Sequence, residues 1–468
     1  MKVTHVSLCQ TDAAKAAGRV ALTPELLAAT GARYSRNNEG LDAIVAKIDP
    51  NRLDASVDSI FRMLDYGHQS IADMVPVAIF MDDISIWLAY HIWSLAPQAG
   101  GQESSTRYIR ISPESLLDCD TLGIPEEFRN EWADAMSEAF GEYSTLEAAW
   151  DKLSAERPQF LHISAELLAD ETPAVQRQVA RMKRNYAFDR ARYLLPSAAR
   201  TNVMMTMSAR AWALLARHLC SDLLPEARAL GEAIRGELQL VAPHLLKHSG
   251  ATADCESGIR DAFNERVARA KAGVPSTLTP EAFGPMAPLP HLEVMAPDGL
   301  GDAEFAEALK YHSNRYAWQG SPLTRTAVRF GWDAVALAEI RDLNRHRTGS
   351  KYSSLVPQGF YCAEDQMPLD EVLPEVAKAA AFGRKLTRCA YDLLAAGDPT
   401  YVYWTLLGTQ FDFEHVTTAD KFIYESELRT GTGSHFRYAR HLADTLAIWY
   451  RRYPSTKGLV IEGSAEPE

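Results

Sequence analysis

The chain has 468 residues, an apolar content of 47% and a formal net charge of -13. Its length exceeds the size at which one hydrophobic core keeps growing, so we expect two domains. The acidic balance excludes a long nucleic-acid surface, which needs clustered Lys and Arg. A local basic pocket for one small anionic ligand remains possible.

The six cysteines are scattered, without a CxxC pair and without clustering near histidines. This pattern predicts reduced thiols in a cytoplasmic protein and no metal site. The N-terminal stretch lacks the apolar core of a signal peptide. No window approaches the roughly 18 unbroken apolar residues of a membrane helix, so we expect no membrane contact.

Strand and helix patterns alternate along the first half. Val75–Met81 contains the β-branched residues Val77 and Ile79, which predict a strand. The apolar segment Ile84–Trp93 that follows predicts a helix. Apolar residues near helical spacing predict further helices over Ala209–Leu219 and Asp444–Arg451. The predicted class is a helix-rich α+β fold.

A polar loop, Glu103–Tyr108, follows the first predicted helix. It carries an acid, two serines and an arginine, and Gly100-Gly101 lets its backbone approach a ligand closely. Guanidinium groups bind phosphate oxygens bidentately, so the loop suits an anionic ligand. Ser and Arg also decorate ordinary solvent-exposed loops, and His68, taken alone, is more typical of a structural hydrogen-bonding residue than of a catalyst.

A proline-rich segment separates the halves. Prolines deny helix donors and favour extended backbone, and this segment contains Pro275, Pro280, Pro285, Pro288, Pro290 and Pro297. We therefore predict a first domain over residues 1–271, a linker over residues 272–301 and a second domain over residues 302–468.

An arginine-rich turn dominates the second half. Gly331–Arg347 predicts a helix that places Arg341 and Arg345 four residues apart on one face. Those charges repel each other unless an acid or an anionic ligand lies between them. Arg345-His346-Arg347 is followed by Gly349 and Ser350, a group suited to a phosphate. Cations near a helix C-terminus are also favoured by the helix dipole, without any ligand.

The two halves form a weak internal repeat. Residues 84–108 and 332–361 each run from a predicted helix through a loop to an Arg-Tyr or Phe-Tyr pair. Each precedes a long region with a helical pattern, residues 191–217 and 401–429. This pattern predicts a tandem duplication.

Together these segments resemble the flavin-dependent thymidylate synthases, whose motif RHRxxSxNxxSxRY joins an arginine-rich turn to a nucleotide loop. The resemblance covers residues 20–265 and, more faintly, 310–452. The first copy keeps the nucleotide loop and has Ser94–Pro97 in place of RHR. The second keeps RHR and has Ser353–Val356, without acid or arginine, in place of the loop. Other segments typical of the family are Ala32–Ser35, Gly67–Ser70, Ala191–Pro196, Thr201, Ser208, Arg210, Leu428-Arg429 and His435.

The resemblance implies two copies of a thymidylate synthase-like domain, each with a small antiparallel sheet. In that family several subunits of a homotetramer build each active site, so we expect a homodimer of this chain to form a four-domain assembly. The residues expected to bind the nucleotide are Glu103, Ser104, Ser105, Arg107, Arg192 and Arg429. Those expected to contact the flavin are His68, Ser70, Arg210, Arg345, His346, Arg347, Ser350 and His435.

Three departures from the family pattern affect flavin or folate contacts. The Asn of SxNxxSxR corresponds to Gln102 in the first copy and Tyr352 in the second. The Glu-His pair before the strand becomes Asp73-Met74, and the Asn of the Asn-x-Arg pair becomes Ser208. Such changes are typical of a changed substrate or reaction.

The implied activity is that of a flavin-dependent methyltransferase, which transfers a one-carbon unit to C5 of dUMP or a related pyrimidine nucleotide. The resemblance implies FAD as cofactor and NADPH and methylenetetrahydrofolate as co-substrates, with no cysteine nucleophile. Arg107 and Arg192 are the expected catalytic residues, with Ser105 as a positioning hydroxyl. Two alternatives remain: flavin-dependent modification of another pyrimidine nucleotide, and a non-catalytic nucleotide- or flavin-binding descendant.

Overall fold

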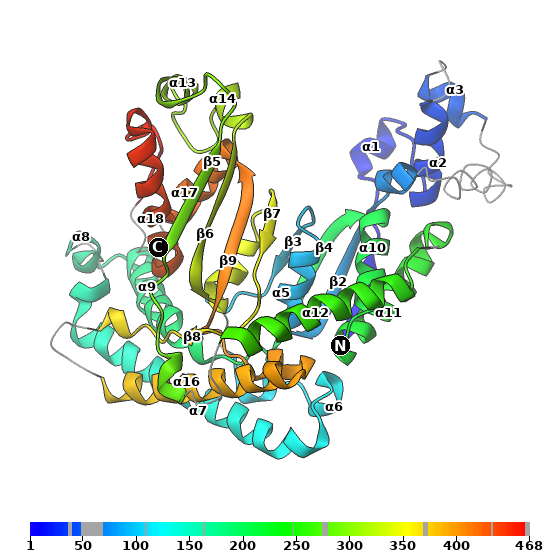
Figure 1. The fold of residues 1–468 in the computed structure, drawn as a ribbon. Helices are drawn as coiled ribbons and strands as arrows, with labels where there is room; N and C mark the ends of the chain where they lie inside the picture. The colour runs from blue at the N-terminus through cyan, green and yellow to red at the C-terminus, as the bar shows by residue number, and fades with distance from the viewer. Residues whose placement is uncertain are drawn as a thin grey trace. The chain divides into compact units, whose positions relative to one another are not determined.

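A computed structural model describes residues 1–35, 40–47, 69–107, 109, 111–161, 163, 165–246, 248–273, 279–367, 373–431 and 434–463 (Figure 1). The chain divides into two compact units. Unit 1 comprises Met1–Ser104, Asp118–Gly123 and Arg200–Phe263. Unit 2 comprises Ser105–Leu117, Ile124–Ala199 and Asn264–Glu468. The units therefore alternate along the chain, unlike the predicted domains 1–271 and 302–468.

Unit 1 holds a four-stranded antiparallel sheet in the order β1-β2-β4-β3. Its strands are β1 (Lys2–Val6), β2 (Pro76–Ser85), β3 (Gly100–Glu103) and β4 (Arg200–Ser208). Its helices are α1 (Asp12–Ala16), α2 (Pro24–Tyr34), α3 (Leu41–Val45), η2 (Gln69–Met74), α5 (Ile86–Leu95), α6 (Cys119–Leu122), α10 (Ala209–Cys220), α11 (Pro225–Val241) and η7 (Pro243–Leu245).

The core of unit 1 lies between this sheet and α10. Val77, Ile79 and Met81 of β2 are buried at alternating positions, as a strand with one covered face requires. The indole of Trp212 in α10 donates a 3.0 Å hydrogen bond to the carbonyl of Val77. This contact fixes α10 against the central strand.

Helix α5 begins at a buried cap. The Oγ of Ser85 accepts a hydrogen bond from the Leu88 backbone N–H at 2.9 Å, which satisfies a donor that the first helical turn leaves open. The carboxylate of Glu226 in α11 accepts bonds from both the N–H and the Oγ of Ser85, each 2.7 Å long. Because the cap of α5 is linked to the first turn of α11 in this way, α5 is held against α11.

Unit 2 holds a five-stranded antiparallel sheet with β5, β6, β9 and β7 in order and β8 paired to β9. Its strands are β5 (Pro290–Met295), β6 (Ala327–Ala336), β7 (Ser350–Tyr352), β8 (Gly359–Phe360) and β9 (Thr409–Thr418). Its α-helices are α7 (Arg129–Glu156), α8 (Ala165–Ala169), α9 (Pro173–Ala191), α13 (Asp302–Ala308), α14 (Ser321–Thr324), α15 (Leu337–Asn344), α16 (Pro374–Ala396), α17 (Ala419–Thr430) and α18 (Phe436–Arg452).

Short 3-10 helices complete unit 2. They are η3 (Pro113–Ser115), η4 (Glu126–Phe128), η5 (Pro158–Leu161), η6 (Arg192–Leu194), η8 (Pro280–Phe283), η9 (Glu364–Gln366), η10 (Pro399–Trp404) and η11 (Pro454–Thr456). Helix α12 (Ala253–Gly273) runs across the division between the two units. Strand β5 lies inside the segment 272–301 that was predicted as a linker.

Helix α15 is the unusual element of unit 2, because all eight of its residues are buried. They include the charged residues Glu339, Arg341 and Asp342. Buried charges need partners, since desolvation penalises each of them.

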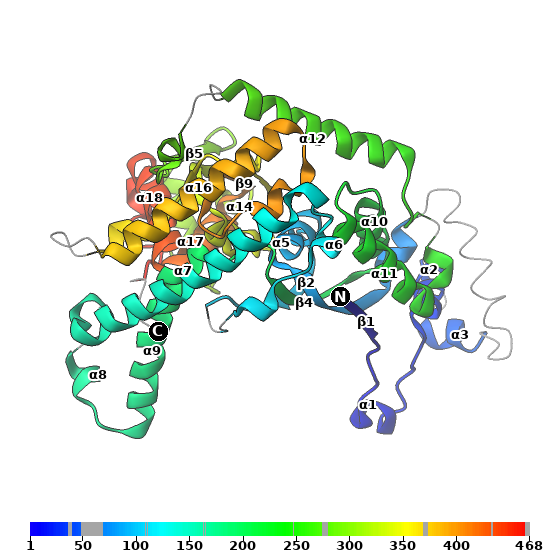
Figure 2. The ribbon, with the colours of Figure 1, turned by 90° about the horizontal axis from the view of Figure 1, so that it is seen from below.

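Elsewhere in unit 2, α7 packs along α9 and α16, as Figure 2 shows.

The two sheets share one topology. In each, a ten-residue strand (β2 or β6) pairs antiparallel with a long later strand (β4 or β9), and the register shifts once, at Met81/Ile84 and at Trp332/Val335. A helix follows each ten-residue strand directly: α5 in unit 1 and α15 in unit 2. A further helix follows each later strand directly: α10 and α17. This structural repeat agrees with the weak sequence similarity between the halves. That it arose by tandem duplication stays a prediction.

The helix-rich α+β class with small antiparallel sheets is confirmed, and so are the predicted β2, α5 and α10. The sequence predicted helix in three places where the structure has a strand. Residues 331–336 belong to β6, and the long regions 191–217 and 401–429 contain β4 and β9. Among the residues that the structure describes, no helix combines the length and apolarity needed to cross a membrane.

Candidate functional site

Four predicted ligand-binding arginines gather in unit 2. Arg107 lies in the loop after β3, Arg192 opens η6, and Arg345 lies at the end of α15. Arg429 lies in the last turn of α17. Residues far apart in the sequence, including Arg107 of the nucleotide loop and Arg345 of the RHR turn, therefore meet within one unit of a single chain.

Asp342 of α15 lies among these arginines. Both terminal nitrogens of Arg192 approach its Oδ2 at 3.2 Å, and Arg345 Nη1 lies 3.8 Å from its Oδ1. Burial penalises an ionised Asp342, yet its pKa lies below the ordinary value because four guanidinium groups surround it: those of Arg192, Arg345, Arg429 and Arg107. Asp342 is thus a fixed anion that holds several cations close together.

Arg107 is held by Asp189 at the end of α9. Its Nε and Nη2 each donate a 2.8 Å hydrogen bond to a different carboxylate oxygen of Asp189, a bidentate pair. Its side chain is 12% exposed, and that of Asp189 is 3% exposed. The Oγ of Ser105 accepts a 3.2 Å bond from the Arg107 backbone N–H, so Ser105 shapes the loop that carries the arginine.

Arg192 is the most deeply buried of the four, at 1% exposure. It also lies 3.7 Å from Glu339, whose Oε1 accepts a 2.7 Å bond from the Tyr193 hydroxyl. Burial raises the pKa of Glu339 to about 7, although Arg192 opposes the shift. Arg192 therefore reaches the site through Asp342 and does not face solvent itself.

Arg429 has neutral hydrogen-bonding partners. Its Nε donates to Nε2 of His346 at 2.8 Å, and its Nη2 donates to the Asp342 carbonyl at 3.0 Å. Burial lowers the pKa of His346 to about 3, and the charge of Arg429 lowers it further, so His346 is a neutral acceptor at pH 7. The same Nε2 lies 3.6 Å from Oε1 of Glu425.

The carboxylates of Asp189 and Asp342 pair with arginines of this cluster. Two of the four arginines reach the accessible side: Arg345, which is 26% exposed, and the partly exposed Arg429. Such an arrangement suits a phosphate dianion.

The rest of the RHR turn lies beside this arginine cluster. Arg347 is half-buried, and Ser350 is exposed at the start of β7. Between them Gly349 adopts a φ of +63°, and a Cβ there would lie 2.0 Å from the Val416 carbonyl oxygen, so only glycine fits this turn. Lys351 Nζ donates to the carbonyls of His346 and Thr348, which ties the turn to β7.

His435 has a structural role in this arrangement. It is fully buried, its Nδ1 accepts a bond from the Arg437 backbone N–H as the cap of α18, and its Nε2 lies 3.2 Å from the Asp189 carbonyl. Both ring nitrogens are therefore engaged within the protein. His435 therefore helps to position Asp189, and its predicted flavin contact stays a prediction.

The other predicted residues belong to unit 1. Arg210 pairs with Asp73 at 2.9 Å, and the Ser208 hydroxyl donates to the same carboxylate at 3.2 Å. Ser70 is exposed in η2. Glu103, buried at the end of β3, and the half-buried Ser104 also lie in this unit, while His68 is outside the described residues.

Sequence reasoning missed the acids that organise the cluster. Asp342 could have been found, because the repulsion between Arg341 and Arg345 requires an acid nearby and Asp342 is adjacent in sequence. Asp189 and Glu339 carried no comparable signal, because their partners lie 82 and 146 residues away.

Comparison with known proteins places this geometry in a family. Residues 19–244 match the family model described as thymidylate synthase complementing protein. This part of the chain belongs to the flavin-dependent thymidylate synthases. The family match includes Arg107 and Arg192 and ends before the RHR turn. The relation of the second half to the family therefore depends only on the sheet topology that it shares with the first half.

Two curated relatives support the membership. A flavin-dependent thymidylate synthase from Clostridium tetani is 23% identical over 236 residues, which are 50% of this chain and 85% of the relative. The UPF0159 protein Ta1429 of Thermoplasma acidophilum is 24% identical over 198 residues, 39% of this chain and 40% of the relative. Among solved structures, the crystal structure of a UMP/dUMP methylase, PolB from Streptomyces cacaoi, bound with 5-Br dUMP, covers 53% of this chain and 93% of its own at 14% identity. The TM-score of this match is 0.34.

Proposed function

We propose that this chain is a flavin-dependent thymidylate synthase-like enzyme that transfers a one-carbon unit to C5 of dUMP or a related pyrimidine nucleotide. The observation that carries the proposal is the gathering of four arginines around Asp342. Membership of residues 19–244 in the family supports it. The proposed substrate class is a pyrimidine nucleoside monophosphate.

In this proposal Arg107 and Arg429 contact the nucleotide. Asp189 holds the guanidinium of Arg107 in a fixed plane, and neutral His346 does the same for Arg429. Preorganised donors stabilise charge without reorganising during the reaction, and this applies to the 5′-phosphate and to negative charge that develops on the pyrimidine as C5 becomes nucleophilic.

Arg192 becomes a positioning residue in this proposal. Its burial against Asp342 and Glu339 keeps it from the ligand itself, and removing it would release Asp342 from its place among the other arginines. Ser105 likewise acts by shaping the loop of Arg107. Glu103 and Ser104 stay predicted nucleotide contacts.

The donor groups in the RHR turn fit the phosphates of a flavin nucleotide. Arg345 and Arg347 are half-buried guanidinium groups on one short turn, and such groups bind pyrophosphate oxygens. When bound, the flavin would supply the hydride of the reaction. NADPH as the reductant and methylenetetrahydrofolate as the carbon donor belong to the same proposal. Ser70, Arg210 and Ser350 stay predicted flavin contacts.

Two buried thiols, those of Cys220 and Cys362, are poorly suited to nucleophilic attack on the pyrimidine. Burial raises the pKa of the Cys362 thiol well above its ordinary value, and it raises that of Cys220 to about 12. Because the thiolate is the reactive form, both side chains are inert at neutral pH. This supports a mechanism in which positioning and electrostatics replace covalent catalysis.

Two measurements on the purified full-length protein test the proposal. A flavin absorption spectrum that stays with the protein through gel filtration is expected first. Tritium release from C5-labelled dUMP, in the presence of NADPH and methylenetetrahydrofolate, is expected second. Release from labelled UMP but not dUMP would identify the other nucleotide as substrate. Flavin without release from either nucleotide would favour a non-catalytic descendant, and a colourless protein that binds no dUMP would overturn the proposal.

A further inference from the structure

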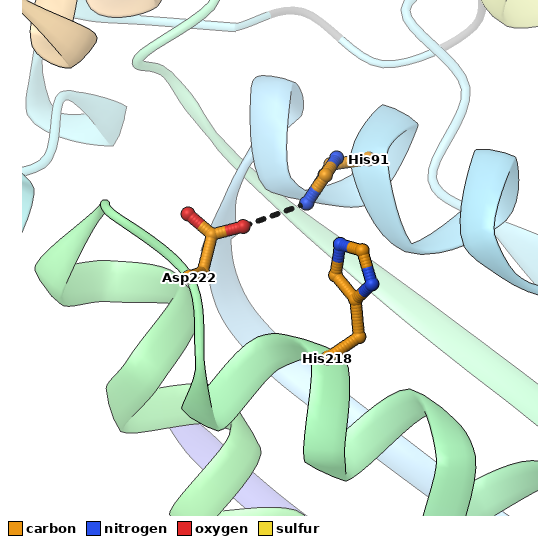
Figure 3. Close-up of side chains that lie close together, drawn as sticks. All are labelled: His91, His218 and Asp222. Carbon is orange, nitrogen blue, oxygen red and sulfur yellow. Dashed lines mark hydrogen bonds and ion pairs between the residues drawn. The ribbon is translucent and has the colours of Figure 1, made fainter. Parts of the chain in front are cut away.

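A second polar cluster lies in unit 1 and includes none of the residues assigned above to ligand binding. His91 of α5, His218 of α10 and Asp222 in the turn after α10 point toward one another (Figure 3). The Nε2 of His91 lies 3.0 Å from Asp222 Oδ2, and one ligand atom from each of the three residues lies within 4.8 Å of the others. Among the described residues, this is the one such group of histidines, cysteines or acids.

The residue types match a metal-ion site. Two imidazoles and one carboxylate are ligands that Zn²⁺ and related divalent transition metals accept, with further positions left to water. Two ligand atoms that share a zinc ion lie about 3.3 Å apart, given Zn–N and Zn–O distances near 2.0 Å. The spacing between His91 and Asp222 is already close to that value, and a ring nitrogen of His218 lies within 4.8 Å of both ligand atoms.

The protonation states favour coordination. Burial lowers the pKa of His218 to about 4, with a further contribution from His91, so its ring is neutral at pH 7, as a metal ligand must be. Burial opposes ionisation of Asp222, but its hydrogen bond with His91 leaves its pKa below the ordinary value. A neutral imidazole and an ionised carboxylate therefore face the same point.

The surroundings fix the ligands and leave a path for an ion. Asp222 Oδ1 accepts a 2.9 Å bond from the Leu224 backbone N–H, and the Asp222 carbonyl accepts a 2.8 Å bond from Arg228. The ring of His91 stacks on Trp87 with an interplanar angle of 11°. Such supporting contacts orient metal ligands. The His91 side chain is still 19% exposed, so the cluster is reached from solvent.

Comparison of the two units adds an independent observation. His91 is the sixth residue of α5, and Asp342 is the sixth residue of α15, the helix at the same place in the unit 2 topology. His218 lies near the end of α10, as Arg429 does near the end of α17. The helix pair that carries the arginine cluster in unit 2 thus carries ligands for a cation in unit 1.

We propose that His91, His218 and Asp222 form a binding site for one divalent transition-metal ion, with Zn²⁺ as the representative ion. The bound ion would connect α5 to the α10–α11 turn and stabilise unit 1, because an ion that binds only the folded state raises stability by mass action. The sequence alone predicts no metal site here, since His91 and Asp222 are 131 residues apart.

The test uses the full-length protein, without a histidine tag and stripped with chelator. Zn²⁺ titrated at pH 7.5 is expected to bind with a stoichiometry of one per chain by calorimetry and to raise the melting temperature. Co²⁺ is expected to produce visible d–d absorption that Zn²⁺ removes. Both readouts are made on the unaltered protein, so they stand even if a variant fails to fold.

Variants locate the site. His218→Leu introduces the residue type found at the corresponding place in α17, Leu428, and Asp222→Asn removes the anionic ligand. Each should weaken Zn²⁺ binding by about tenfold or more, since loss of even an outer contact to a ligand costs that much. The matched control is His244→Ala, which removes a histidine that pairs with one carboxylate, Glu25, at 2.8 Å in the same unit. It should bind Zn²⁺ as the unaltered protein does.

Three results would overturn the proposal. One is the absence of Co²⁺ absorption and of Zn²⁺ heat in the unaltered protein. Another is Zn²⁺ affinity that stays the same in folded His218→Leu and Asp222→Asn. The third is an equal loss in His244→Ala, which would reveal unspecific binding to surface histidines. In each case the three residues form an ordinary His–Asp ion pair beside a second imidazole.

Discussion

The guanidinium of Arg429 donates a 2.8 Å hydrogen bond to the ring nitrogen Nε2 of His346. The bond requires an unprotonated imidazole, and burial provides one by lowering the pKa of His346 to about 3. A cation is thereby oriented by a neutral partner, and its charge stays available to a ligand. This pair explains why RHR contains a histidine between its two arginines.

Replacing Arg429 with Lys should weaken dUMP binding although the charge is kept. Lysine cannot donate to His346, to the Asp342 carbonyl and to a phosphate from one planar fork. The loss of a charge-assisted hydrogen bond predicts an affinity about tenfold lower, measured by calorimetry. The control is Arg440→Lys, because Arg440 is 67% exposed on α18 and pairs with Asp365. Equal affinity in Arg429→Lys and the control would remove Arg429 from the site.

The histidines predict a loss of stability in mild acid. Burial lowers the pKa of His346 to about 3 and of His218 to about 4, from 6.5, and it holds those of His435 and His441 well below 6.5. Below pH 6.5 the unfolded chain binds protons that the folded chain does not, so the free energy of unfolding falls as the pH is lowered toward 4. Glu339, with a pKa of about 7, has the opposite effect: between pH 7 and 4.5 it raises the free energy of unfolding as the pH is lowered. The four histidines together have the larger effect.

Urea denaturation at pH 7 and pH 5 measures this effect, and His346→Gln isolates one contribution. Glutamine can still accept a bond from Arg429 and cannot be protonated. The decline between the two pH values should be smaller in the variant by about 2 kcal/mol, the value for one histidine that titrates only when unfolded. An unchanged decline would show that His346 does not contribute.

Removing Arg192 should destabilise the fold as well as the site. Its guanidinium, 1% exposed, lies against Asp342 and Glu339, and loss of one partner leaves a buried charge uncompensated. Arg192→Met should therefore lower the free energy of unfolding by about 3–5 kcal/mol. Adding Asp342→Asn should cost less than the two single losses together, because the anion is then gone too. The exposed Arg329→Met is the control and should leave stability nearly unchanged.

Mixing two inactive variants distinguishes two forms of the site. The family resemblance predicts that Arg107→Ala and Arg345→Ala, refolded together, regain activity, because different subunits share each site. The structure places both guanidinium groups near Asp342 in one unit of one chain. We therefore expect each variant to be inactive in tritium release and the mixture to stay inactive. Restored activity would indicate that sites form between chains, as the predicted homodimer requires.

Regular alternation and helical spacing made part of the fold predictable. Val77 and Ile79 marked β2, and the apolar stripe around Trp212 marked α10. Residues 331–336 were misread because this strand is buried on both faces, and a continuous apolar run does not distinguish a strand from a helix. Strand pairing between β6 and β9 joins residues more than seventy positions apart and leaves no local signal.

The arginines of the candidate site could be predicted from the sequence, whereas its acidic residues could not. The RHR turn and the loop of Arg107 stand out as motifs, whereas Asp189 becomes a partner of Arg107 only through tertiary packing. A motif position also singled out His435, but no local signal indicated that this residue is fully buried and caps α18. Burial is therefore the quantity that a single sequence conveys least.

Calorimetry with dUMP and deoxyuridine tests the central claim most directly, because the two ligands differ only by the phosphate. The arginine cluster predicts that dUMP binds the unaltered protein at least about a hundredfold more tightly than deoxyuridine, as two charge-assisted bonds would provide. It also predicts that Arg107→Ala/Arg429→Ala binds both ligands equally weakly. Undiminished dUMP affinity in that folded double variant would contradict the account.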